Sequence, residues 1–296
     1  MTRYLLRLKD ITLDLSSRTH IMGVLNITPD SFSDAGRFMP GGSADCGMAV
    51  EAALMMADDG ADIIDIGGES TRPGAGLVTT REELARVLPV IQGIREHSGV
   101  PISIDTYKSK TASEAVAAGA SIINDISGLG FDDKMAGVAY ATGAAVVLQH
   151  IKGTPDDMQK DPHYDDVVSE VAAFLEERAG KALLAGISRD RIIIDPGIGF
   201  GKTAEHNLAL INRLDVIAGL GYPVLLGTSR KAFIGRLTGG APASDRLEGT
   251  VASSVIGIVR GANIIRVHDV KAAARAATVA DAILKEGLMA KTFRDA

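Results

Sequence analysis

Short apolar runs rich in β-branched residues recur along the chain, and most are followed by a longer segment with helical spacing. The runs occupy residues 20–29, 61–68, 101–106, 121–128, 144–150, 191–197, 223–229 and 263–269. They are nearly continuous rather than alternating, which is typical of parallel strands covered on both faces. Helical spacing is clearest in residues 44–60, 167–186 and 271–287. The pattern predicts eight parallel strands that alternate with helices.

Eight such repeats without an interrupting linker predict an α/β fold, a (β/α)8 TIM barrel in a single domain of residues 1–296. Residues 1–19 are predicted to form an N-terminal β-hairpin that closes the bottom of the barrel, and residues 20–290 the barrel itself. A doubly wound open sheet would alternate in the same way, so it stays open as an alternative.

Local signals mark the ends of several helices. Thr80 and Glu83 have the spacing of a capping box before an apolar helical segment. Glycines stand where helices should stop and turn toward the next strand, at Gly60, Gly119, Gly143, Gly186 and Gly221.

Composition narrows the class of protein. The 296 residues are 46% hydrophobic, which is enough for a sizeable core. A formal net charge of −6 argues against binding to nucleic acid or to an anionic membrane, since both need clustered Lys and Arg. The single cysteine, Cys46, fits a reducing compartment, and no apolar run reaches the ~18 residues of a membrane span. We therefore expect a cytoplasmic protein.

The stretch "IIIDPGIGFGKT" (192–203) resembles a nucleotide-binding loop but misses both familiar patterns by one position. The pattern G-x-x-x-x-G-K-[ST] would need glycine at Pro196, and G-x-G-x-x-G from Gly197 would need glycine at Lys202. We expect Lys202 and Thr203 to start the next helix rather than to hold an ATP phosphate.

Each predicted strand ends in polar residues. They are Asn26, Asp65, Asp105, Asn124, Gln149 with His150, Asp195, Ser229 with Lys231, and Arg266 with His268. One such aspartate could simply cap the following helix. A barrel, however, points all eight strand ends at one face, where active sites of this fold lie. Because burying these groups without partners is costly, the set predicts a ligand site.

The residue types indicate what this ligand is. Asp105, Asn124 and Asp195 are rich in acceptors, and a carboxylate can pair side-on with the N–H groups of an amidine-like edge. Lys231, Arg266 and His268 supply donors, as an anionic group requires. The site therefore suits a heterocycle at one end and an anion at the other.

Seven motifs at these strand ends closely resemble the bacterial dihydropteroate synthase family. They are "MGVLNITPDSFSD" (22–34), "GGESTRPGA" (67–75), "ISIDT" (102–106), "NDISG" (124–128), "DPGIGFGK" (195–202), "GTSRK" (227–231) and "RVHD" (266–269). The resemblance implies a transferase of folate biosynthesis that condenses 6-hydroxymethyl-7,8-dihydropterin diphosphate with para-aminobenzoate, releasing diphosphate and 7,8-dihydropteroate. Sulfonamides compete with para-aminobenzoate in this family.

The resemblance also implies roles for particular residues. Those expected to bind the pterin are Asp105, Asn124, Gln149, Asp195, Gly227 and Lys231. Those expected to bind the diphosphate are Asn26, Arg266 and His268, with Asn26 also a ligand of Mg²⁺, the one cofactor implied. Mg-assisted loss of diphosphate would leave a pterin-stabilised methylene cation, which the arylamine attacks.

Loops after the first two strands are expected to complete the site. The para-aminobenzoate site would comprise Phe32, Thr71, Arg72, Pro73, Phe200 and Ala232, and the catalytic residues would be Asp34, Arg72 and Lys231. For Phe32 the alternative is an anchor of a surface loop, and for Arg72 a solvated loop charge. Gln149 stands where the family often has methionine, and Ala232 where it often has serine.

Two rival functions remain. One is a pterin-dependent methyltransferase with the same barrel, although Arg72 and the "RVHD" anion site (266–269) are not required for a reaction without diphosphate. The other is a non-catalytic pterin-binding paralogue. The resemblance further suggests a homodimer through the last helices, to which the apolar residues 251–262 could contribute. The alternative for this segment is the interior face of a barrel helix.

Overall fold

The eight predicted parallel strands form a closed barrel in the computed structural model, which describes residues 3–28, 38, 45–71 and 76–287. The strand order is β8-β7-β6-β5-β4-β3-β10-β9. The ring closes where Ile194 forms a parallel bridge with Val224 and its N–H donates to the carbonyl of Pro223 at 2.9 Å. The TIM barrel is therefore confirmed, and the open-sheet alternative is wrong because no pair of sheet edges is left.

Each barrel strand lies within its predicted apolar run. The strands are β3 (His20–Asn26), β4 (Ile63–Gly67), β5 (Ile102–Asp105), β6 (Ile122–Asp125), β7 (Ala145–Gln149), β8 (Ile192–Asp195), β9 (Leu225–Leu226) and β10 (Ile264–Val267). The N-terminal hairpin is also confirmed, as the antiparallel pair β1 (Leu5–Arg7) and β2 (Thr12–Asp14).

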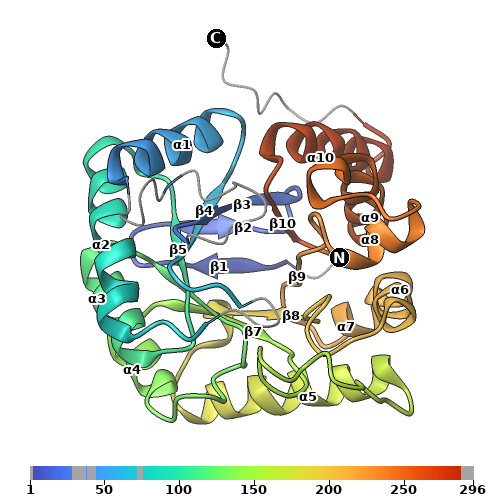
Figure 1. Cartoon of the computed structure of the whole chain (residues 1–296), viewed down its shortest axis with the longest axis horizontal. Coiled ribbons are helices and arrows are strands. Elements are labelled where there is room, and N and C mark those ends of the chain that lie inside the picture. The colour runs from blue at the N-terminus through green and yellow to red at the C-terminus, as the bar shows by residue number, and fades with distance from the viewer. Residues whose placement is uncertain (1–2, 29–37, 39–44, 72–75, 288–296) are drawn as a thin grey trace.

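Helices surround the barrel in chain order (Figure 1). They are α1 (Cys46–Asp58), α2 (Thr80–His97), α3 (Ser109–Ala118), α4 (Met135–Thr142), α5 (Val167–Leu184), α6 (Ala204–Asn212), α7 (Leu214–Ala218), α8 (Ala232–Leu237), α9 (Leu247–Val259) and α10 (Val270–Leu284). The five glycines predicted at helix ends all have positive φ. Among the described residues, none of these helices has the length and apolar character needed to traverse a bilayer.

The capping box of α2 lies one residue earlier than predicted. Thr79, not Thr80, accepts the N–H of Glu82, whose side chain accepts the N–H of Thr79 in return. Glu83 is instead buried, on the same face as Val87. The prediction was wrong because helical spacing does not fix which of two adjacent threonines begins the first turn.

The interior of the barrel changes from apolar to polar along most of its strands. Its lower part is a single apolar cluster that combines Leu6, Leu8 and Leu15 around the hairpin with Met22, Ile63, Ile122, Ala145, Val147, Ile193, Leu225 and Ile264 of the strands. Because side chains on a strand alternate between faces, the residue two positions further faces the same interior. Asp65 follows Ile63 in this way, Asn124 follows Ile122, and Arg266 follows Ile264. The hairpin therefore closes an apolar base, above which the polar strand ends gather.

Candidate functional site

A cavity of about 890 Å³ opens at the carboxyl ends of the strands. The predicted residues that line it are Asn26, Thr71, Asp105, Phe200, Gly227, Lys231, Ala232, Arg266 and His268. Asn124, Gln149 and Asp195 are buried at the ends of β6, β7 and β8, on the interior side of the barrel. Residues Phe32, Asp34, Arg72 and Pro73 lie outside the described residues.

Arg266 holds two carboxylates together across the mouth of the barrel. Its Nε donates to Asp65 Oδ2 at 2.6 Å, and its Nη2 donates to Asp105 Oδ2 at 2.7 Å. Asn124 Nδ2 donates to the same oxygen of Asp65 at 3.1 Å. Asp65 ends a predicted strand but is not among the predicted site residues. Its inward position, two residues after Ile63, was the signal that could have found it.

Burial raises the pKa of two aspartates at the strand ends, Asp105 and Asp195. The pKa of Asp105 rises to about 7, although Arg266 opposes this shift. The pKa of Asp195 rises to about 6, opposed by the N–H of Gly197 and by the charge of Lys231. A ligand that donates N–H groups to these side chains would favour their ionised forms, because it would replace the solvation that burial removes.

Several buried polar atoms in this part of the barrel have no hydrogen-bond partner within the described residues. They are Asp65 Oδ1, Ser103 Oγ, Asp105 Oδ1, Asn124 Oδ1 and Gln149 Nε2. A buried donor or acceptor without a partner costs about 1–3 kcal/mol. Most of these atoms are acceptors and one is an amide donor, so the site suits a flat ligand with several N–H groups and at least one acceptor. Ser103 was not predicted, since it lies inside its strand rather than at the end.

Positive and hydroxyl groups line the other side of the cavity. Lys231, the N-cap residue of α8, has its Nζ 4.4 Å from the ring centroid of Phe200. His268 Nδ1 lies 2.9 Å from Ser229 Oγ, which also accepts the backbone N–H of His268 at 3.2 Å. With Arg266 nearby, this side is suited to an anion although the whole chain is acidic.

The loop after β8 fits closely against the loop after β7. A Cβ on Gly197 would lie 1.9 Å from the carbonyl oxygen of His150, and one on Gly201 would lie 2.4 Å from that of Lys152. Both glycines also have positive φ, of 67° and 63°. Tyr164 Oη donates to the carbonyl of Gly201 at 2.8 Å. The two loops therefore pack together as one unit beside the cavity.

The side chain of Lys202 points into these two packed loops. Its Nζ donates to the carbonyls of Gly197 and Phe200 at 3.0 and 2.9 Å and lies 2.8 Å from His150 Nδ1. Burial lowers the pKa of Lys202 and also that of His150, so a neutral imidazole can accept from the lysine. Thr203 is the N-cap of α6, as the expected helix start requires. Lys202 instead stabilises the loop, a role that no local sequence pattern indicates.

Comparisons with known proteins give one consistent result. Residues 22–268 match the family described as pterin binding enzyme. The dihydropteroate synthase of Bacillus subtilis is 50% identical over 94% of this chain and 93% of its own length. The crystal structure of Yersinia pestis dihydropteroate synthase with a sulfonamide drug complex superposes with a TM-score of 0.90, at 40% identity, over 95% of this chain and 99% of that one. The Xanthomonas albilineans enzyme with 4-aminobenzoic acid has a TM-score of 0.87 at 44% identity, over 96% and 99% of the two chains.

Proposed function

The chain belongs to the family of pterin-binding enzymes, and from this premise we propose that it is a dihydropteroate synthase. It would condense 6-hydroxymethyl-7,8-dihydropterin diphosphate with para-aminobenzoate to give 7,8-dihydropteroate and diphosphate. The observation that carries the proposal is the polarity of one cavity. Asp105 lines this cavity, and acceptor oxygens of Asp65, Asp105 and Asn124 at the strand ends have no partner within the described residues, while cationic groups line another side of the cavity.

The pterin would bind at the inner end. Asp195 would pair with the amidine-like edge of the ring, in the fork geometry that carboxylates use with arginine. Asp105 and Asn124 would accept further N–H groups with the oxygens that have no protein partner in the described structure. Gln149 Nε2 would donate to an acceptor of the ring, which makes this contact more polar than the methionine common at this position in the family.

The diphosphate would lie toward Asn26, Arg266 and His268. The described residues contain no group of three His, Cys, Asp or Glu side chains that could hold a metal ion by themselves. Mg²⁺ commonly keeps several waters and is held by one or two protein oxygens together with substrate phosphates, so Asn26 Oδ1 fits this role. Mg²⁺ bound there would neutralise charge on the departing diphosphate.

In the reaction, the bond between the pterin methylene carbon and the diphosphate oxygen breaks, and its electron pair leaves with diphosphate. The arylamine nitrogen then bonds to the methylene carbon and loses one proton. Arg266 and His268 would stabilise the negative charge that develops on the departing diphosphate. Lys231 lines the same cavity, with its Nζ over the ring of Phe200. Phe200, Ala232 and Thr71, which line the same cavity, would enclose the arylamine.

A direct assay tests the proposal. Purified protein with Mg²⁺, the pterin diphosphate and para-aminobenzoate should release diphosphate only when both substrates are present. Absence of release would contradict the synthase and favour the non-catalytic paralogue. Methyl transfer from a methylated folate to a corrinoid protein would favour the methyltransferase instead.

Assembly and location are further parts of the proposal. Helices α9 and α10 expose the apolar side chains of Ile256, Val259, Val279 and Ile283, which supports a homodimer through the last helices. Light scattering coupled to size-exclusion chromatography should give twice the mass of the chain. A cytoplasmic location is supported by the single cysteine, Cys46.

A further inference from the structure

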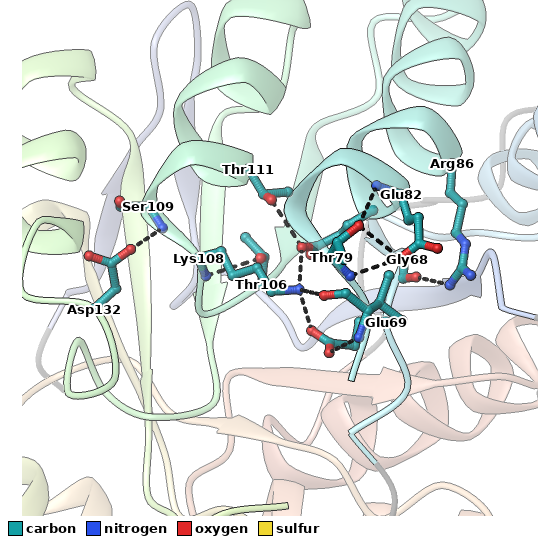
Figure 2. Close-up of polar contacts among 12 residues, drawn as sticks. Gly68, Glu69, Thr79, Glu82, Arg86, Thr106, Lys108, Ser109, Thr111 and Asp132 are labelled. Carbon is teal, nitrogen blue, oxygen red and sulfur yellow. Dashed lines mark hydrogen bonds and ion pairs between the residues drawn. The ribbon is translucent and has the colours of Figure 1, made fainter. Parts of the chain in front are cut away.

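Lys108 is the centre of a buried ion cluster beside the cavity (Figure 2). Its Nζ donates to Glu69 Oε2 at 2.7 Å, to Glu83 Oε2 at 2.9 Å and to the carbonyl of Val78 at 2.7 Å. The side chain of Glu83 is fully buried, and that of Glu69 is 6% exposed. All three donor positions of the ammonium are thus used by partners within the protein, and the Lys108 side chain is 17% exposed.

The cluster joins the two ends of the segment between β4 and α2. Glu69, just after β4, accepts the N–H of Val78 with Oε1 at 2.9 Å, while its other oxygen binds Lys108. Arg86 of α2 donates to the carbonyl of Gly68 at 2.7 Å. Lys108 therefore holds Glu69 and Val78, nine positions apart in the chain, against each other.

This segment reaches the cavity directly after the cluster. Glu69, Ser70 and Thr71 line the cavity, whereas Lys108 does not. The start of α3 is fixed by other contacts, since Ser109 N–H donates to Asp132 Oδ2 at 2.8 Å (Figure 2). The ammonium of Lys108 thus stabilises the segment after β4 more than the helix that follows Lys108.

We propose that Lys108 is a positioning residue for the second substrate, which it does not touch. By tethering Glu69 to Val78 it would fix the direction in which Ser70 and Thr71 face the cavity. This inference rests on the proposed function, in which Thr71 contacts para-aminobenzoate. Binding of the pterin would change less, because the ammonium of Lys108 contacts the segment after β4, whereas Asp105, at the end of the strand before Lys108, is held by Arg266.

Kinetics of Lys108→Met test the inference. The KM for para-aminobenzoate should rise about tenfold or more, because small misplacements of contacting groups have large effects, while the KM for the pterin diphosphate changes less than about twofold. Lys108→Arg should restore much of the loss, since arginine can also bridge two carboxylates. The matched control is Lys110→Met on α3, where Lys110 is exposed and pairs only with Glu114 among the described residues. Equal changes for both substrates, or no change, would overturn the inference.

A double variant guards against misfolding. Lys108→Met leaves the buried carboxylate of Glu83 without its counter-charge, so Lys108→Met combined with Glu83→Gln removes that charge as well. The double variant should keep the same selective rise in the KM for para-aminobenzoate. If the double variant instead has the wild-type KM for para-aminobenzoate, the rise seen in Lys108→Met comes from the uncompensated charge of Glu83 and not from the loss of the link between Glu69 and Val78.

Hydrogen exchange separates this inference from the proposed function. The amide of Val78 should exchange faster in Lys108→Met than in Lys108→Arg or Lys110→Met, because its acceptor, Glu69, is no longer held. Unchanged protection would overturn the tether whatever the activity. If the wild-type protein showed no synthase activity, the proposed function and the role toward para-aminobenzoate would both fail, and exchange alone would decide the tether.

Discussion

Replacing Asp195 by asparagine should make the ligand-free protein more stable above neutral pH. Burial raises the pKa of this carboxyl from 3.8 to about 6, so ionisation is harder in the folded protein than in the unfolded chain. Each pKa unit corresponds to about 1.4 kcal/mol, so the ionised carboxylate costs the folded state about 3 kcal/mol. Asparagine has nearly the same shape and carries no charge.

The sign follows from proton linkage. Because the unfolded chain loses the proton first, the folded protein loses stability as the pH rises from about 4 through about 6. Asp195→Asn has no carboxyl group at this position, so it does not lose this stability as the pH rises. Its advantage in free energy of unfolding should therefore grow by about 2 kcal/mol between about pH 4.5 and about pH 8. Other titrating groups are present in both proteins and cancel in the difference.

Urea unfolding of both proteins across this pH range, without ligand, measures the difference. The matched control is Asp166→Asn at the start of α5, where hydrogen bonds from Ser169 and Arg213 lower the pKa of Asp166 to about 2. Because Asp166 is ionised in both the folded and the unfolded protein above about pH 4.5, the difference in stability between that variant and wild type should stay nearly constant across this range. A difference for Asp195→Asn that stays constant or shrinks with pH would refute the reasoning. The same variant should bind the pterin poorly, so stability and affinity should move in opposite directions.

Three further outcomes are expected. In calorimetry, Arg266→Ala should weaken binding of the diphosphate substrate more than binding of the bare pterin, and equal losses would show that the anion site is misplaced. In urea unfolding the same variant should lose about 3–5 kcal/mol of stability, because it leaves two buried carboxylates without their counter-charge. Gly197→Ala should abolish activity and lower the melting temperature, since its Cβ would overlap the carbonyl of His150; a normal enzyme would show that the two loops separate freely. Thr79→Ala should cost about 1 kcal/mol in thermal unfolding and Thr80→Ala much less, whereas the reverse order would restore the capping box at Thr80.

The barrel could be predicted because its signals are local and repeated. An apolar run that ends in a polar residue identifies both a strand and the face to which its end points. Asp105, Asn124, Asp195 and Arg266 were found in this way, and the motifs around them supplied their expected roles. The closing strand β9 has only Leu225–Leu226 in the ladder, yet the run around it was long enough to be recognised.

Partnerships between distant residues could not be predicted. Arg266 and Asp65 are 201 positions apart, and nothing in either local sequence indicates that they meet. Glu83 has the spacing of a capping residue, but its contact with Lys108 depends on how α2 packs against α3. Lys202 stands in a stretch that resembles a phosphate-binding motif without matching it, and only the packing of two loops shows that its ammonium points inward.

The close packing of the loops after β7 and β8 has a consequence for protein design and for the evolution of related sequences. Where Gly197 meets the carbonyl of His150, and Gly201 that of Lys152, not even a methyl group can be inserted on one side alone. Any change of length or bulk in one loop must be matched in the other. Among relatives, we expect the two loops to vary as a pair, and a designer who wishes to widen the cavity on this side would have to exchange both at once.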